Sequence, residues 1–319
     1  MNVLRPYAAA HPAAERRDRL GRAVFLAQAL FDLSRGRQSL LSIAGAGLAA
    51  VLAARGMPSL RVTAIGLVAA WAGYFVAFSL NDVFDRKTDA EALRAGKERT
   101  EGYDVDTAFI RHPLAAGKLS LGVSVAWVVG LTLIASVGAW TLNPLSFAFF
   151  ALGAALDVLY SALRHVTWTK TIVTGAMVGC GGIAGWVAVA PLGRGVIPVF
   201  VFLALWEIGG RNLANDLADL GPDSAVGLRT VACTFGPRVA ARAVLVVGSA
   251  MVASVAVLQM PAAAVIMALA AGVWFVVRPG VLLVREPTSA RAGTYFNWAS
   301  VYPVVVLLVA LAGLSLARL

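Results

Sequence analysis

The chain has 319 residues, of which 59% are apolar and only 14% are charged, and its mean hydropathy is +0.78. Soluble domains carry about 25% charged residues, so this composition excludes a disordered chain and argues against a soluble globular enzyme. The net charge of +10 would suggest a nucleic-acid partner in a soluble protein. Two distant cysteines, Cys180 and Cys233, have no CxxC spacing and predict neither a disulfide framework nor a zinc site.

In chain order, a basic arm comes first and a series of apolar segments follows. Residues 1–37 carry seven Arg and no short apolar core of a signal peptide, which predicts a cytosolic amphipathic arm on the membrane surface. A helix needs about 20 apolar residues to cross the bilayer core. Residues 38–319 therefore predict one transmembrane domain in an all-α, polytopic bundle of about nine helices. The expected spans are about 38–54, 60–80, 121–141, 144–162, 171–191, 196–214, 239–257, 261–277 and 299–317.

The positions of the basic residues indicate the topology. With the N-terminus on the cytosolic side, every Lys and Arg lies on that side except Arg55, Arg61, Arg194 and Arg318. Cytosolic loops carry such an excess of Lys and Arg. The positive charge is thus a topology signal, so we expect membrane lipids and no nucleic acid as partners. The two largest loops, about 81–120 and 212–238, are both expected to face the cytosol.

A repeated acidic motif is the strongest signal in the sequence. Residues 81–89 read NDVFDRKTD and residues 215–223 read NDLADLGPD, so both fit N-D-x-x-D-x-x-x-D. Each copy follows a long apolar span, the second and the sixth, which suggests an internal duplication of helix groups. Acids at a helix C-terminus oppose the helix dipole, so two matching copies are hard to explain as surface decoration.

Helix geometry gathers each set of carboxylates. At about 100° per residue, Asp82, Asp85 and Asp89 share one stripe of a helix. The same spacing holds for the second copy, although Gly221 and Pro222 are expected to loosen its last turn. Six carboxylates near apolar spans would repel one another unless a hard divalent cation intervened. Mg²⁺ combines few carboxylates with phosphate oxygens. The predicted metal ligands are Asp82, Asp85, Asp89, Asp216, Asp219 and Asp223, facing a diphosphate.

With these motifs, the chain resembles the UbiA superfamily of intramembrane prenyltransferases over nearly its whole length. The first motif of that family stands here as Asn81, Asp82, Asp85 and Asp89, and the second as Asp219, Asp223, Gly227 and Thr230. The stretch HPLAAGKLS, from His112 to Ser120, is similar to the family's RPLPSGRIS-type loop. Tyr160-Ser161 with Arg164 and Lys170 resembles its YSxxxxRxK element. The chain departs from the family pattern in its His112, where arginine is more usual, and in an insertion at about Ala90 to Ile110.

The resemblance implies a Mg²⁺-dependent transfer of a prenyl group from an isoprenoid diphosphate to an acceptor within the membrane. The acceptor could be an aromatic compound, a quinone precursor or another small or lipid molecule. Asp82, Asp85, Asp216, Asp219 and Tyr160 are implied to act in catalysis. Diphosphate and substrate contacts are expected from Asn81, Lys118, Arg164, Lys170, Arg211, Asn212 and Asn215.

Other polar and aromatic residues lie inside the spans. Asp157 and Glu207 are ionisable groups within membrane segments, where such groups are rare. We expect internal ion pairs, Asp157 with Arg164 or Glu207 with Arg211, in preference to direct catalysis. Rings near the inner helix ends could shield a carbocation, and the candidates are Tyr74, Phe75, Phe78, Tyr160 and Trp206.

Two alternatives remain open from the sequence. A UbiA-type terpene cyclase would use the same donor and metal without an acceptor. A secondary transporter would also contain helix repeats with buried charges, but here the acids cluster at the helix ends and no span is plainly broken. For the prenyltransferase and the cyclase alike, we expect an integral protein of the plasma (inner) membrane, with its active site facing the cytosol.

Overall fold

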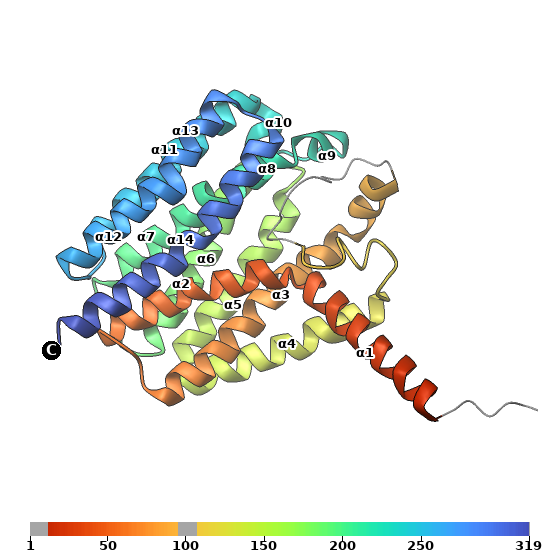
Figure 1. The fold of residues 1–319 in the computed structure, drawn as a ribbon, viewed down its shortest axis with the longest axis horizontal. Helices are drawn as coiled ribbons and strands as arrows, with labels where there is room; N and C mark the ends of the chain where they lie inside the picture. Colours follow the sequence, from red (N-terminus) through yellow and green to blue (C-terminus); the bar gives the residue numbers. More distant parts are fainter. Residues whose placement is uncertain (1–11, 95–106, 319) are drawn as a thin grey trace, which may run out of the picture.

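The computed structural model describes residues 12–94 and 107–318. The first part of the predicted arm (1–11), part of the predicted insertion (95–106) and residue 319 lie outside these described residues. Within them, every regular element is helical (Figure 1). The predicted all-α class is confirmed.

The elements follow one another along the chain with short connections. The first half contains α1 (Pro12–Leu33), α2 (Gly36–Ala54), α3 (Leu60–Arg94), α4 (Leu121–Leu142), α5 (Pro144–Leu163) and α6 (Lys170–Val187). Next, α7 (Val196–Leu205) continues through the π-helical segment η1 (Trp206–Asn212) into α8 (Leu213–Ala218), and α9 (Leu220–Ala225) and α10 (Val231–Phe235) are short. The last part contains α11 (Pro237–Ser254), the 3₁₀ turn η2 (Val255–Val257), α12 (Ala262–Gly272), the π-helical η3 (Val273–Val277), α13 (Arg278–Arg285) and α14 (Ser289–Leu316).

Eight helical stretches in the described part of the chain are long and apolar enough to cross a membrane. They coincide with eight of the nine expected spans. The expected span at 171–191 is not among them, although it does form a helix, α6. Three boundaries differ clearly from the expected ones. Helix α3 continues past residue 80 to Arg94, the span from Ala262 extends to Arg285, and the last span begins at Ser289 instead of residue 299.

Close packing against other helices explains why α6 is less apolar than its neighbours. This helix packs between α2, α5 and α7, and its glycines allow the close approach. A Cβ at Gly185 would lie 2.4 Å from the carbonyl oxygen of Ala46, and one at Gly182 would lie 2.4 Å from Leu203. Larger apolar residues would force these backbones apart. The helix therefore has small residues where a lipid-facing span has large ones.

Polar caps set the helix starts next to the connections. The Ser120 side chain accepts a hydrogen bond from the backbone N–H of Val123 at the start of α4. Asn143 caps α5 in the same way, and Pro144 occupies the first helical position, where its missing N–H costs nothing. Such signals stop and restart helices abruptly, which permits the short links between antiparallel neighbours.

Two ends of the bundle can be distinguished from contacts between connections. At one end, Arg318 donates to the carbonyl oxygens of Ala54 and Arg55. At the other end, the backbone N–H of Arg229 donates to the carbonyl oxygen of Arg164 at 2.8 Å. The main apolar core lies between them, around the fully buried Trp206 of η1. The ends of α3 and α8 reach the same side as α9 (Figure 1).

Candidate active site

A polar cavity of about 230 Å³ lies between the C-terminal parts of α3, α5 and α8 and the N-terminal part of α6. Both acidic motifs line it. Asn81, Asp85 and Asp89 come from α3, and Asn215, Asp216, Asp219 and Asp223 come from α8 and α9. The two copies of the sequence motif, far apart in the chain, therefore meet across one cavity.

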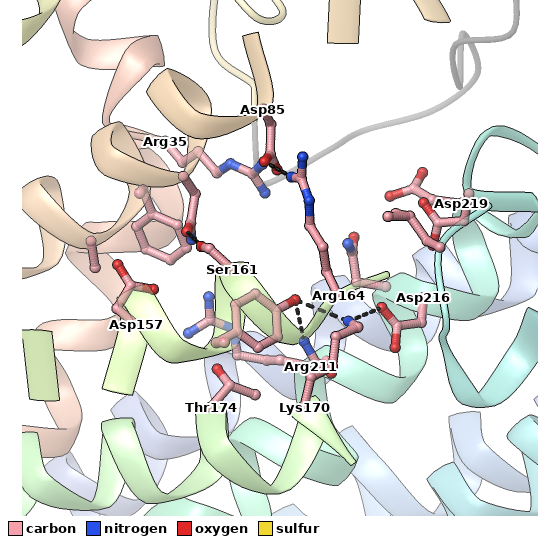
Figure 2. A pocket seen from close by; sticks show the side chains of 18 of the residues that line it. Arg35, Asp85, Asp157, Ser161, Arg164, Lys170, Thr174, Arg211, Asp216 and Asp219 are labelled. Atoms are coloured by element: carbon pink, nitrogen blue, oxygen red, sulfur yellow. Dashed lines mark hydrogen bonds and ion pairs between the residues drawn. The ribbon is translucent and has the colours of Figure 1, made fainter. Parts of the chain in front are cut away.

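The first motif lies on a single uninterrupted helix, as its spacing predicts. The Asp82 carboxylate is only 4% exposed and is not itself part of the cavity lining, and Arg35 Nη2, which does line the cavity, lies 3.6 Å from it. Asp89 Oδ2 is 3.2 Å from Nδ1 of His112. Asp85 forms an ion pair with Arg164 from the end of α5, visible in Figure 2. The acids of this motif are held by cations from three other parts of the chain.

The second motif does not form one continuous helical stripe. The helix ends at Asp219, whose φ is −98° and ψ is 17°, and a new short helix starts at Leu220. Pro222 has no N–H to continue the α8 hydrogen-bond ladder, so α8 cannot run unbroken through the motif. The break is earlier than the loosened last turn that the sequence suggests. Asp216, Asp219 and Asp223 nevertheless all line the cavity.

A buried network joins α5, α6 and α8 at the centre of the cavity wall. Lys170 Nζ donates to the Tyr160 hydroxyl at 3.1 Å and to Asp216 Oδ1 at 3.2 Å (Figure 2). The amide of Asn212 also donates to the Tyr160 hydroxyl, at 3.1 Å. Thr171 in turn donates to Asn212 at 2.7 Å. The network fixes a cation and a phenol hydroxyl against the second motif.

Deeper in the cavity, one expected ion pair forms and another does not. Arg211 lies 3.3 Å from Glu207, so the expected i,i+4 pair is confirmed. Arg211 also donates to Ser42 at 2.9 Å and lies over the Phe78 ring at 5.5 Å. Arg164 pairs with Asp85 instead of Asp157, because the end of α5 points toward α3.

Two of the expected site residues, Asp82 and Lys118, are not part of the cavity lining. Asp82 is buried against Arg35 and His112, which do line the cavity, whereas Lys118 lies elsewhere. The Lys118 side chain is exposed in the connection before α4. Conversely, sequence reasoning missed Arg35, Gln38 and Arg111, which do line the cavity. Arg35 belongs to the predicted arm. Nothing in the sequence near it marks it as a site residue.

A second, apolar cavity of about 360 Å³ adjoins the polar one between α2, α3, α5 and α6. The two cavities share wall residues, among them Tyr74, Asp157 and Met177. Of the expected aromatic rings, Tyr74, Phe78 and Tyr160 line the polar cavity, whereas Phe75 and Trp206 are buried in the apolar core. The site thus consists of a charged chamber, which is the polar cavity, and an adjoining apolar cavity.

Burial and neighbouring charges shift the pKa values of Asp223 and His112 at this site. Burial, and then the neighbouring charges of Asp216 and Asp219, raise the pKa of Asp223 to about 8. Burial lowers the pKa of His112, but the neighbouring carboxylates of Asp82 and Asp89 outweigh this effect and raise the pKa to about 10.

Several buried acceptor atoms also have no hydrogen bond within the described residues. Asp82 Oδ1, Asn215 Oδ1 and Asp216 Oδ2 are such atoms, and all belong to the acidic motifs. A buried acceptor without a partner costs about 1–3 kcal/mol. Oxygen ligands of this kind fit a hard divalent cation.

Comparison with known proteins identifies the family. Residues 40–301 match the model of the UbiA prenyltransferase family. The chain belongs to this family. UbiA prenyltransferases transfer prenyl groups from isoprenoid diphosphates to acceptors, so the enzyme class and function predicted from the sequence are confirmed.

The relatives carry related activities in their names. The 4-hydroxybenzoate octaprenyltransferase of Vibrio campbellii is 26% identical over 216 residues, which are 65% of this chain and 68% of the relative. The digeranylgeranylglyceryl phosphate synthase of Thermococcus kodakarensis is 23% identical over 67% of this chain and 71% of its own length.

Solved UbiA structures share the fold. A UbiA homologue from Aeropyrum pernix superposes with a TM-score of 0.68 at 20% identity, covering 88% of this chain and 98% of the homologue. A homologue from Archaeoglobus fulgidus, bound to DMAPP and Mg²⁺, gives a TM-score of 0.62 at 15% identity, covering 88% of this chain and 99% of the homologue. These matches agree with an integral membrane bundle of the UbiA type.

Proposed function

We propose that this UbiA prenyltransferase binds the diphosphate of its isoprenoid donor, together with Mg²⁺, in the polar cavity between the two acidic motifs. The single observation that carries the proposal is that one chamber is lined by both motifs and by five Arg and Lys side chains, Arg35, Arg111, Arg164, Lys170 and Arg211. Mg²⁺ bound to oxygens of Asp82, Asp85, Asp89, Asp216, Asp219 and Asp223 would supply Lewis-acid neutralisation of diphosphate charge.

The basic side chains would hold the diphosphate and stabilise it as it leaves. Arg164 and Lys170 each pair with one acid of a different motif, Asp85 and Asp216. Their charges are thereby fixed in place before the donor arrives. Preorganised charge of this kind stabilises a transition state without reorganisation during the reaction. The hydroxyl of Tyr160 and the amide of Asn212 continue the polar wall beside Lys170.

The prenyl chain would extend into the apolar cavity, which adjoins the charged chamber. An allylic cation formed when the C1–O bond breaks would then lie near the rings of Tyr74, Phe78 and Tyr160, which can stabilise it. The apolar lining would also exclude water from this cation. Water exclusion favours transfer to an acceptor over hydrolysis.

We also propose that the chamber opens toward the cytosol at the inner membrane. The distribution of Lys and Arg supports this orientation. The contact of Arg318 with Arg55 supports it as well, since both belong to the small set of basic residues assigned to the opposite side.

The identity of the acceptor follows from a direct experiment. Purified enzyme is incubated with Mg²⁺ and donors of increasing chain length, with 4-hydroxybenzoate, with a glyceryl phosphate acceptor or with no acceptor, and products are read by mass spectrometry. These acceptors correspond to the named relatives. We expect a prenylated product whose formation requires an acceptor. A cyclic terpene formed from donor alone would favour the cyclase, and donor uptake into vesicles without any product would favour a transporter.

A further inference from the structure

Three side chains with metal-binding atoms meet on the α3 side of the cavity. Asp82 and Asp89 come from α3, and His112 comes from the connection before α4. His112 Nδ1 lies 3.2 Å from Asp89 Oδ2 and 3.8 Å from Asp82 Oδ1. One ligand atom from each of the three residues lies within 4.8 Å of the others. This is a mixed nitrogen and oxygen donor set.

One buried carboxylate oxygen of this cluster lacks a hydrogen-bond donor within the described residues. Asp82 is 4% exposed, and its Oδ1 accepts no hydrogen bond within the described residues. The nearest cations are Arg35 Nη2 at 3.6 Å and His112 Nδ1 at 3.8 Å. Both distances are too long for a hydrogen bond. A cation between Asp82 and His112 would satisfy this buried oxygen.

The separations are compatible with ligands of one ion. Two atoms about 2.1 Å from a metal are about 3.0 Å apart when they are at right angles and about 4.2 Å apart when they are opposite. The distances of 3.2 and 3.8 Å from His112 Nδ1 fall between these limits. The third separation, between the carboxylate oxygens of Asp82 and Asp89, is within 4.8 Å.

The backbone near His112 is braced by hydrogen bonds to other elements. The carboxylate of Asp32 in α1 accepts from the backbone N–H groups of Ala108 and Phe109, each at 2.7 Å. His112 itself has φ of 45° and accepts from the N–H of Ala116 at 2.9 Å. The ligand is therefore presented from a fixed connection, which favours a defined coordination geometry.

We propose that His112 Nδ1 is a protein ligand of the divalent metal at the first acidic motif, beside Asp82 and Asp89. The inference rests on the proposed function, which assigns a divalent metal to this motif. Imidazole nitrogen suits first-row transition metals better than it suits Mg²⁺. The first motif of this enzyme therefore has a higher affinity for Mn²⁺ than a site built of carboxylates alone.

Pulsed electron paramagnetic resonance of bound Mn²⁺ tests the proposal directly. The full-length protein in detergent is loaded with Mn²⁺ alone or with Mn²⁺ and inorganic pyrophosphate, in nitrogen-free buffer. The expected result is ¹⁴N coupling of a directly bound imidazole in at least one of the two samples. Labelling with [¹⁵N]histidine should replace this coupling by that of ¹⁵N, a result that needs no variant.

Two matched variants assign the nitrogen to a residue. His112→Gln should abolish the coupling and weaken Mn²⁺ binding about tenfold. His165→Gln, which changes an exposed histidine in another connection, should change neither. Absence of histidine coupling in both wild-type samples, or its persistence in His112→Gln, overturns the proposal.

Prenyl transfer with Mg²⁺, measured on the same preparation, separates two kinds of failure. An active enzyme whose bound Mn²⁺ shows no histidine nitrogen refutes His112 as a ligand and leaves the proposed function intact. A protein that binds no divalent metal in either sample and transfers no prenyl group contradicts both.

Discussion

Lys170 offers a test of the charged chamber in which stability and activity can be separated. Its side chain is 3% exposed and its ammonium group lies between the Tyr160 hydroxyl and Asp216 Oδ1. Lys170→Met leaves the Asp216 carboxylate buried without its cation. Breaking a buried ion pair in this way costs about 3–5 kcal/mol of stability. The loss of one preorganised charge should also lower kcat/KM for prenyl transfer about 10²–10³-fold.

The double variant Lys170→Met/Asp216→Asn removes both charges. We expect it to recover most of the thermal stability in detergent, because no uncompensated charge remains, and to stay inactive. Lys118→Met is the matched control, since Lys118 is an exposed lysine outside the cavity, and it should keep wild-type activity. The reasoning is refuted if folded Lys170→Met keeps activity within about twofold of wild type, or if the double variant is no more stable than the single one.

Three further outcomes are expected from the acidic motifs. Asp82→Ala and Asp219→Ala should each abolish turnover while the protein still elutes as a folded species in size-exclusion chromatography. An active variant would show that the substituted acid is not needed for catalysis. Chelation with EDTA should stop prenyl transfer and Mg²⁺ should restore it, whereas full activity in chelator would contradict the metal requirement. Because the pKa of Asp223 is raised from 3.8 to about 8, its contribution to stability is fully present below about pH 4 and is lost as the pH rises to about 8. Melting temperatures in EDTA should therefore fall more steeply over this range in wild type than in Asp223→Asn, and equal slopes would show that Asp223 does not titrate there.

The repeat in the sequence was sufficient to predict which segments meet, because it combines a strong helical spacing with a fixed position after an apolar span. Helix α3 has no Gly or Pro between Asp82 and Asp89, so the predicted stripe forms as expected. In the second copy, Pro222 interrupts the ladder and Asp219 ends the helix. The residue types of the second motif still predicted that its acids line the cavity. The helical spacing of that motif did not predict the break in its backbone at Asp219.

The parts of the site that the sequence did not predict come from long-range packing. Arg35 lies after α1 and reaches Asp82 only because Ser34 hydrogen-bonds to Ser79 and Trp127, which ties that turn to α3 and α4. Lys118 carries the right charge in a family-like stretch, but its connection turns the side chain outward. Neither outcome follows from local spacing.

Long-range packing also explains why α6 is not among the helices that are apolar enough to cross a membrane. Helix α6 is surrounded by other helices, so its residues are selected for close approach and not for contact with lipid. Gly182 and Gly185 shorten the distances to α7 and α2. The expected boundaries at 171–191 were broadly right for the helix, while its glycines and Lys170 lowered its apolar character.

In the proposed function, both acidic motifs hold the metal and the diphosphate at one site. A structure of the enzyme with Mn²⁺ and an unreactive prenyl thiolodiphosphate, examined by anomalous scattering at the manganese edge, would locate both groups. We predict manganese density within coordination distance of carboxylates from both α3 and the α8–α9 segment. Manganese bound at only one motif, or a diphosphate found outside the chamber, would contradict the account.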